Sequence, residues 1–137
     1  ASPRQGPNAT LSGNCGQATE RPVTVVGTGG AGYIGSHMVR AFRLAGLECV
    51  VVDDFSSGHR EFVPDGVPLI DNTILDSTVV AKAMVEYEVE AVVHLAGFKY
   101  AGGSVQRPLH TYEQNVQGMG SQLQAMHEAE VDKIVFS

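Results

Sequence analysis

The chain has 137 residues, of which 43% are hydrophobic and 18% are charged. Nine basic and fifteen acidic side chains give a net charge of −6. This length suits one domain with one core. The acidic balance and scattered basic residues argue against nucleic-acid or anionic-membrane partners. No apolar run approaches the roughly 18–20 residues that span a bilayer. The first residues lack the order of a signal peptide, so we expect a cytoplasmic protein.

Two regions of different composition divide the chain. Residues 1–22 are rich in Pro, Gly, Asn, Ser and Thr, without apolar periodicity, and are expected to be a flexible leader. Residues 23–137 alternate short β-branched runs with amphipathic segments, which predicts an α/β domain with a parallel sheet. The expected strands are Val23–Val26, Cys49–Val52, Val67–Ile70, Ala91–Leu95 and Ile134–Phe136.

Three amphipathic helices are predicted between these strands. The first helix is expected to end at Gly46. Its inward face is expected to hold Ile34, Met38, Ala41, Phe42 and Ala45. Asp76 is placed to cap the second, whose stripe is Val79, Val80, Ala83, Met84 and Tyr87. Pro108 opens the third, a long helix with an expected inward face of Leu109, Tyr112, Val116, Met119, Leu123 and Met126.

A glycine-rich turn between the first strand and the first helix reads V-T-V-V-G-T-G-G-A-G-Y-I-G-S (Val23–Ser36). Glycines let a pyrophosphate approach the backbone closely, and the helix N-terminus then favours its charge. The next strand ends in Asp53, eighteen residues after Gly35, where a carboxylate can accept hydrogen bonds from a ribose. Together these features predict a dinucleotide site in a Rossmann-like three-layer fold of about five strands. A glycine turn without a ligand is the alternative.

The type of dinucleotide is suggested by Asp53 and Asp54, which would repel a 2′-phosphate and so favour NAD over NADP, although Arg60 is not far along the chain. Cys49 and His94 lie in apolar strands and are expected to be packed core residues. The dispersed histidines show no spacing typical of metal ligands.

Several segments resemble the extended short-chain dehydrogenase/reductase family, and within it the UDP-hexose 4-epimerases. The first is T-G-G-A-G-Y-I-G-S-H (Thr28–His37). Four others carry the same resemblance: V-V-V-D-D-F-S-S-G-H (Val50–His59), A-V-V-H-L-A-G-F-K-Y-A-G-G-S-V-Q-R-P-L (Ala91–Leu109), Y-E-Q-N-V-Q-G (Tyr112–Gly118) and K-I-V-F-S (Lys133–Ser137).

The resemblance implies NAD as the cofactor and a set of residues that bind it. The phosphate loop would be formed by Gly29, Gly32 and Gly35, with Tyr33 and Ile34 at the pyrophosphate. The adenosine side would be bound by Asp53, Asp54, Phe55, Ser56, Ser57, Gly58, Thr73 and Ile74. The remaining cofactor contacts would be Leu95, Ala96, Gly97, Phe98, Lys99 and Asn115. Lys99 as a solvated loop residue and Asn115 as a helix-packing residue are the alternatives.

Three positions depart from the family pattern, and one of them is Gly27, which replaces the usual β-branched residue before Thr28. Thr73 replaces an Asp that contacts adenine in the family, so adenine recognition is expected to be weaker. Gly103 stands where the epimerases often have Glu.

The catalytic residues of the family are not found in this chain. The family uses a Ser or Thr and a Tyr-x-x-x-Lys motif, but the residues four positions after the tyrosines are His37, Ala91, Ser104 and Val116. The chain is therefore expected to be a truncated NAD-binding portion, with no substrate domain and a sheet incomplete at its C-terminal side. The complete enzyme would interconvert UDP-glucose and UDP-galactose through a 4-keto intermediate.

Three expectations about partners and activity follow from the resemblance. This chain alone would be inactive and would meet a UDP-sugar only with the missing half present. It would also pair with a second copy or self-associate through its uncovered strand. A stand-alone non-catalytic dinucleotide-binding module and a fragment of a related nucleotide-sugar dehydratase are the alternative functions.

Overall fold

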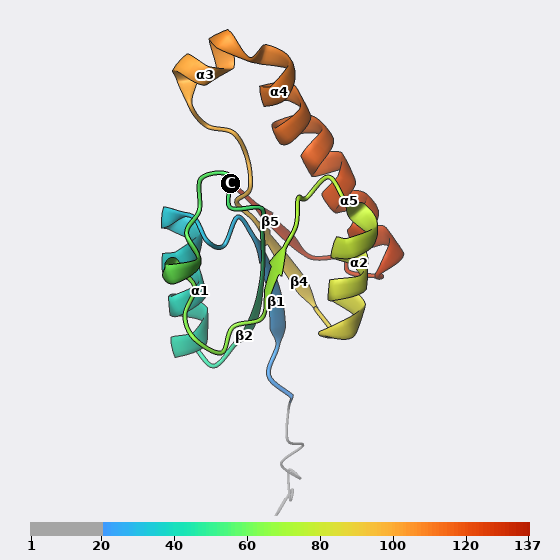
Figure 1. Ribbon diagram of the computed structural model, residues 1–137. Helices are drawn as coiled ribbons and strands as arrows, with labels where there is room; N and C mark the ends of the chain where they lie inside the picture. Colours follow the sequence, from blue (N-terminus) through green and yellow to red (C-terminus); the bar gives the residue numbers. More distant parts are fainter. Residues whose placement is uncertain (1–20) are drawn as a thin grey trace, which may run out of the picture.

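The computed structural model describes residues 21–137, which form one parallel sheet with helices on both faces (Figure 1). The strands are β1 (Thr24–Thr28), β2 (Glu48–Asp53), β3 (Leu69–Asp71), β4 (Ala91–His94) and β5 (Ile134–Phe136). The predicted α/β fold with five parallel strands is thereby confirmed. The expected leader lies outside the described residues apart from its last two, of which Arg21 forms an ion pair with Glu88.

The strand order is β3-β2-β1-β4-β5, with every neighbouring pair parallel. Thr28, at the end of the central strand β1, pairs with Val52 of β2 on one side and with His94 of β4 on the other. The chain therefore moves in one direction along the sheet after β1 and in the opposite direction after β3. The carboxyl ends of all five strands meet at one edge, where this reversal opens a crevice.

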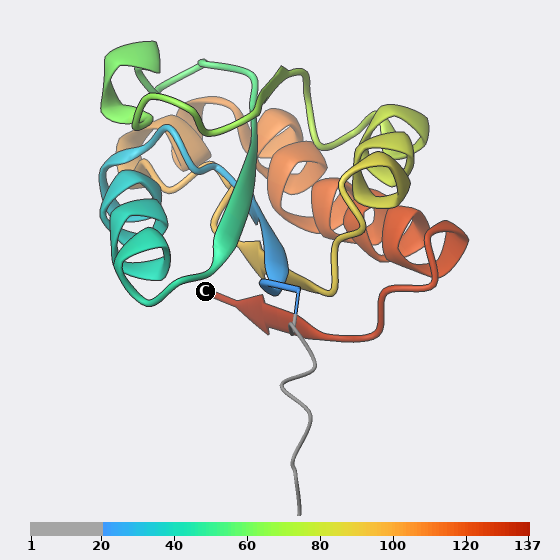
Figure 2. The same ribbon diagram turned by 90° about the horizontal axis from the view of Figure 1, so that it is seen from below.

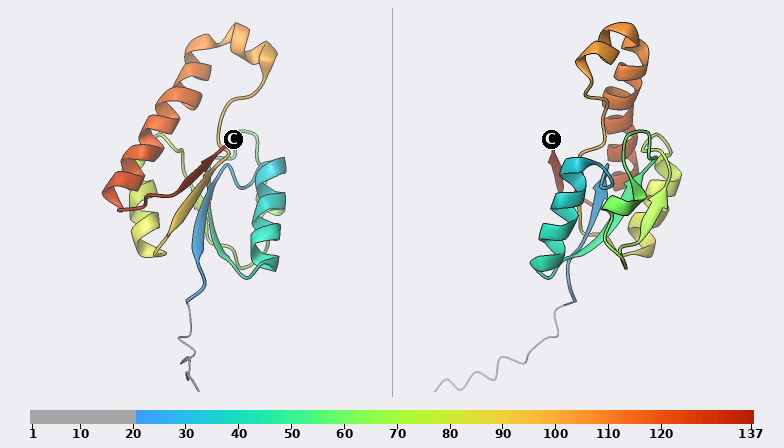
Figure 3. Two further views of the ribbon diagram at one scale, coloured as in Figure 1. Left: turned by 180° about the vertical axis from the view of Figure 1, so that it is seen from behind. Right: turned by 60° about the vertical axis from the view of Figure 1, so that its left-hand side comes forward.

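The two faces of the sheet are covered by different helices. Helix α1 (Tyr33–Leu44) lies on one face, and α2 (Ser77–Glu86) and α5 (Gly118–Glu128) lie together on the other (Figure 2). The short elements are η1 (Arg60–Phe62), α3 (Ala101–Gln106), α4 (Pro108–Tyr112) and the π-helical turn η2 (Glu113–Gln117). Figure 3 shows that α3 and α4 extend beyond the carboxyl edge of the sheet.

The side chains of β2 point alternately to the two faces of the sheet and contribute to a hydrophobic core on each face. Val50 and Val52 join a buried cluster under α2 and α5, whereas Cys49 and Val51 pack with Val39 of α1. Successive side chains of a strand point to opposite faces, so a strand covered on both sides is apolar throughout. Cys49 is buried, as expected.

Helix α2 agrees with its predicted cap and stripe. The Asp76 side chain accepts a hydrogen bond from Val79 N at 3.2 Å, and Val80, Ala83 and Met84 are buried. At the end of the first helix, Gly46 has φ +82° and stops the helix as predicted.

The predicted inward face of the first helix is wrong in part. Ile34, Ala41 and Ala45 are exposed, and the buried residues of α1 are Gly35, Ser36 and Val39. Gly35 packs directly on the backbone of the preceding turn, and this contact sets the rotation of the helix about its axis.

The predicted inward face of the long helix is also wrong in part, although Met126 is buried as predicted. The helix is continuous in α4, η2 and α5, with α3 as an additional element, but Leu109, Tyr112, Val116 and Leu123 are exposed. The buried residues of α5 are Gly118, Gln122, Ala125 and Met126. Ala125 packs in the core cluster with residues of α2, and Gly118 packs closely on Ile74, so the apolar stripe remains on the outer side. Between residues 21 and 137, no helix is long and apolar enough to cross a membrane.

Candidate functional site

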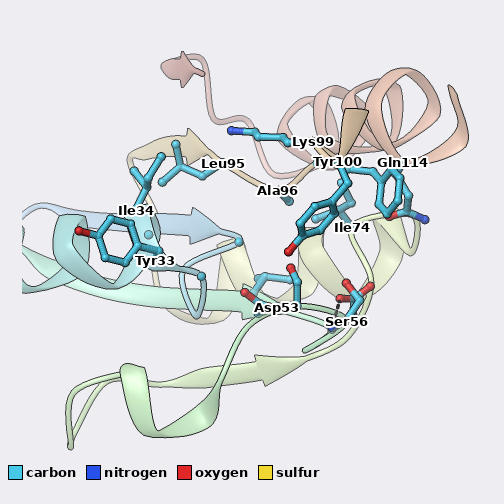
Figure 4. A pocket seen from close by; sticks show the side chains of 18 of the residues that line it. Tyr33, Ile34, Asp53, Ser56, Ile74, Leu95, Ala96, Lys99, Tyr100 and Gln114 are labelled. Carbon is cyan, nitrogen blue, oxygen red and sulfur yellow. Dashed lines mark hydrogen bonds between the residues drawn. The ribbon is translucent and has the colours of Figure 1, made fainter. Parts of the chain in front are cut away.

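A cavity of about 590 Å³ opens at the carboxyl edge of the sheet (Figure 4). Its walls come from the glycine turn after β1, the ends of β2 and β3, the loop after β4, and the segment from α3 to η2. The cavity therefore occupies the crevice where the strand order reverses, which is the usual ligand position in open α/β sheets. Its volume lies in the range of about 300–1,000 Å³ that is typical of small-molecule sites.

The glycine turn forms one wall and requires its glycines at two positions. Gly29 has φ +74°, and a Cβ there would lie 2.7 Å from the backbone nitrogen of Ala96. A Cβ on Gly35 would overlap the carbonyl oxygen of Gly29 and lie 2.7 Å from the Gly30 Cα. The turn thus packs tightly between α1 and the loop after β4.

The N-terminus of α1 opens into this cavity. Gly32 is the N-cap and supplies no capping side chain, and the first turn contains no acidic residue. Tyr33, Ile34 and Gly35 of this turn line the cavity. The first N–H groups of a helix have no partner within it and carry a partial positive charge. They are suited to bind the phosphates of a nucleotide.

Asp53 joins the glycine turn to the loop after β2. Its buried carboxylate accepts hydrogen bonds from Ala31 N at 3.0 Å (Oδ2) and from Phe55 N at 2.8 Å (Oδ1). Each carboxylate oxygen has a further lone pair. Asp53 lines the cavity and can therefore also accept hydrogen bonds from ribose hydroxyls.

Arg60 is held away from these carboxylates. It forms an ion pair with Asp71, and its guanidinium lies 4.3 Å from the centre of the Phe55 ring. Arg60 does not line the cavity, whereas Asp53 and Asp54 do. The carboxylates that line the cavity are therefore not paired with Arg60, a charge pattern that would suit NAD and would repel the 2′-phosphate of NADP.

The loop after β4 is fastened to the π-helical turn by one side chain. Phe98 N donates a hydrogen bond to Asn115 Oδ1 at 2.7 Å, and Asn115 Nδ2 donates one to Phe98 O at 2.9 Å. Asn115 supports this loop from behind, and its neighbour Gln114 lines the cavity instead.

Most of the residues predicted to bind the cofactor lie together on this cavity. They are Gly29, Gly32, Tyr33, Ile34, Gly35, Asp53, Asp54, Ser56, Ser57, Ile74, Leu95, Ala96, Gly97, Phe98 and Lys99. Their contact with NAD remains a prediction.

Four predicted residues do not line the cavity. Phe55 lies beneath Arg60, Asn115 holds Phe98, and Gly58 packs against the backbone of Ala31. Thr73 accepts a hydrogen bond from Leu75 N through its hydroxyl at 3.2 Å.

Six residues of the cavity were not predicted from the sequence. They are Val52, Asn72, Tyr100, Arg107, His110 and Gln114. Val52 and Asn72 lie at the ends of predicted strands or just beyond them, so position at a strand end was an available signal. Tyr100, Arg107 and His110 belong to the segment that folds over the cavity, and no local pattern in the sequence predicts that fold.

His94 lies beside the cavity in the core. Its ring Nδ1 is 2.8 Å from Thr28 Oγ1, a buried hydrogen bond, and the ring stacks on that of Phe136 with centres 5.8 Å apart. Burial lowers the pKa of His94, and the positive charge of Lys99 lowers it further. His94 is thus a packed core histidine, as expected. In the described part of the chain, no group of three or more His, Cys, Asp or Glu side chains is arranged to hold a metal ion.

Comparison with known proteins agrees with this geometry. Residues 25–137 match the NAD dependent epimerase/dehydratase family. The chain belongs to this family. The resemblance that we noted in the sequence is therefore confirmed.

Several proteins that this family member is similar to are UDP-glucose 4-epimerases. The enzyme of Azospirillum brasilense is 42% identical over 113 residues, which cover 82% of this chain and 32% of the relative. The crystal structure of the Thermus thermophilus enzyme in complex with NAD has a TM-score of 0.80 at 38% identity, covering 83% of this chain and 37% of that one. A Stenotrophomonas maltophila enzyme with bound NAD and formylated UDP-arabinopyranose has a TM-score of 0.80 at 31% identity, covering 83% and 36%. The chain spans about a third of the length of the curated relatives it matches.

Proposed function

We propose that this chain binds NAD and is the cofactor-binding portion of an epimerase that interconverts UDP-glucose and UDP-galactose. One observation carries the proposal: Asp53, the glycine turn and the open N-terminus of α1 converge on one cavity. The Thermus thermophilus epimerase, which is similar over 83% of this chain, is complexed with NAD. The relatives described above are UDP-glucose 4-epimerases, which favours this reaction over that of a dehydratase.

The residues of the cavity fit a dinucleotide. The free N–H groups of the first turn of α1 would bind the pyrophosphate, and Asp53 would bind the adenosine ribose. Lys99 extends from the loop after β4 toward Leu95 (Figure 4), where it would donate to polar groups of the nicotinamide half. NAD, when bound, supplies reversible hydride acceptance, which epimerisation at a sugar carbon requires.

Proton transfer from the sugar hydroxyl needs a general base within hydrogen-bonding reach. We propose that this base is not among the 137 residues, because none of the four tyrosines is followed by a lysine in Tyr-x-x-x-Lys spacing. In this proposal the chain binds cofactor without turnover and needs further residues to bind a UDP-sugar.

We also propose that the chain self-associates. The outer stripe of the long helix exposes Leu109 and Tyr112, at 84% and 56% of their surface. The edge strand β5 exposes Val135 and Phe136 at 63% and 62%. Burying such surface on a second copy would be favourable. Size-exclusion chromatography with light scattering should show a species larger than 14.5 kDa. A monomer at all concentrations would contradict the proposal.

Calorimetric titration with NAD tests the binding function. The chain should bind NAD, and Asp53→Ala should weaken binding by about 1–3 kcal/mol because ribose hydroxyls lose their acceptor. Asp65→Ala is the matched control, since Asp65 is exposed and lies outside the cavity. Circular dichroism of both variants verifies the fold. No heat of binding in the wild-type chain would overturn the proposal.

A further inference from the structure

Tyr100 stands in the cavity from the loop between β4 and α3. Figure 4 shows its ring crossing the cavity, with the hydroxyl directed to the side on which Asp53 and Ser56 lie. The side chain is 64% exposed, so its ring faces are free to contact a ligand. Within residues 21–137 the hydroxyl makes no hydrogen bond, and the ring orientation therefore comes from packing.

The packing that orients Tyr100 begins at Phe98. The two rings meet edge to face, with centres 5.7 Å apart. The Phe98 backbone is fixed by its two hydrogen bonds with the Asn115 side chain, one donated and one accepted. A Cβ on Gly103 would lie only 2.7 Å from the Phe98 ring. Because residue 103 is glycine, α3 can approach this ring closely. Tyr100 is thus set in place before any ligand binds.

The base of a bound dinucleotide would lie near this ring. Asp53 ends β2 and would hold the ribose that carries the base, and β3 is the next strand outward. The base therefore falls beyond Asp53, toward the end of β3, where the apolar side chain of Ile74 and the side chain of Asn72 line the cavity.

Each side-chain acceptor at the end of β3 already accepts one hydrogen bond or forms an ion pair, and none of them is an unpaired carboxylate. Asn72 Oδ1 accepts from Thr73 N at 2.7 Å, and Thr73 Oγ1 accepts from Leu75 N at 3.2 Å. The Asp71 carboxylate is paired with Arg60. The end of β3 thus presents no free carboxylate to the exocyclic amine of an adenine.

We propose that Tyr100 stacks on the adenine of the bound dinucleotide and that stacking, rather than a hydrogen bond to the exocyclic amine, holds the base. The inference rests on the proposed NAD binding. Stacking on an aromatic ring tolerates any base, because every base has a π face. The site accordingly accepts a purine that lacks the amine.

Calorimetry with two ligands and three variants tests this inference. The wild-type chain should bind NAD and nicotinamide hypoxanthine dinucleotide with dissociation constants within about threefold of each other. Tyr100→Ala should weaken both equally, by roughly 5- to 150-fold, the range for loss of one stacked base. Tyr100→Phe should keep wild-type affinity for both ligands. Leu44→Ala, at an exposed position outside the cavity and outside the proposed self-association surface, should also keep it.

The outcomes separate this inference from the function on which it rests. If NAD binds but Tyr100→Ala has wild-type affinity, the stacking role is wrong while NAD binding stands. If NAD binds more than about tenfold tighter than the hypoxanthine analogue, recognition through the amine replaces the proposed stacking. If neither ligand binds the correctly folded wild-type chain, the proposed function and this inference both fall.

Discussion

Asn115 and Phe98 form a two-way pair across seventeen residues of sequence. The amide of Asn115 accepts from the backbone nitrogen of Phe98 and donates to its backbone oxygen, as a neighbouring strand would. A single side chain thereby replaces a stretch of regular structure and fixes the cavity wall. The loop after β4 owes its position to a residue that does not itself line the cavity.

Replacing Asn115 should therefore weaken the positioning of the loop after β4, which forms one wall of the cavity, although Asn115 does not line the cavity itself. Asn115→Leu removes two hydrogen bonds, each contributing roughly 0.5–1.5 kcal/mol. We expect a lower free energy of unfolding and NAD binding weakened by roughly three- to tenfold. Gln117→Leu, in the same turn and likewise exposed, is the control for urea denaturation and calorimetry. Unchanged NAD affinity in Asn115→Leu would show that the pair does not position the loop.

Gly35 and Gly120 should respond oppositely to the same substitution. Alanine is favoured over glycine in a helix by about 1 kcal/mol. At Gly120, where a Cβ meets open space, Gly120→Ala should raise the stability by up to that amount. At Gly35 the Cβ would overlap the Gly29 backbone, so Gly35→Ala should lower the stability by about 1–3 kcal/mol. Urea denaturation measures both, and a stabilised Gly35→Ala would contradict the packing.

His94 should make stability depend on pH. Burial lowers its pKa in the folded chain below the ordinary value of 6.5, and Lys99 adds to the shift. Well above pH 6.5 the His94 ring is neutral in the folded and in the unfolded chain, so its pKa shift does not change the free energy of unfolding. As pH falls through 6.5 the unfolded state takes up the proton first, so the free energy of unfolding falls. The loss at a pH one unit below 6.5 is at most about 1.4 kcal/mol.

The His94 effect can be isolated with variants. His94→Gln should flatten the stability profile between about pH 7.5 and 5.5 in urea denaturation. His37→Gln, at an exposed position, should follow the wild-type profile. The same fall in His94→Gln as in the wild type would assign the pH dependence to other groups.

Gln122 should be a site where an apolar residue stabilises the fold. Its side chain is fully buried, and neither amide atom has a hydrogen-bond partner among the described residues. An unpaired buried polar group costs about 1–3 kcal/mol. Gln122→Leu should therefore raise the free energy of unfolding by about that amount. The exposed control Gln124→Leu should change it by about 0.5 kcal/mol or less. A destabilised Gln122→Leu would mean that a buried water satisfies the amide.

The features that were predicted correctly from the sequence are those that depend on residues close together in the chain. The glycine turn, Asp53 and the Asp76 cap each depend on a few neighbouring residues, and the structure places each where the sequence indicated. The faces of the first and the long helix were mistaken because periodicity shows which residues share a side, not which side is inward. In the long helix, Gly118 packs on Ile74 and Ala125 packs in the core, while most of the apolar stripe stays outside.

The cavity residues from the α3–α4 segment could not be predicted for a related reason. Tyr100 and His110 reach the cavity because the chain turns back over the sheet edge. That turn depends on the contact of Phe98 with Gly103 and on the two hydrogen bonds between Phe98 and Asn115. These contacts join residues whose relation becomes visible only in three dimensions.

The π-helical turn sets how far α4 is rotated relative to α5 about the axis of the long helix. One residue corresponds to about 100° of rotation in a regular helix. A turn with one extra residue thus lets α5 bury Gln122 and Ala125 while Gln114 and His110 still face the cavity. Deleting a single residue between Glu113 and Gln117 would turn α4 against α5 by about that angle. The core would keep its contacts, and the cavity would lose one wall.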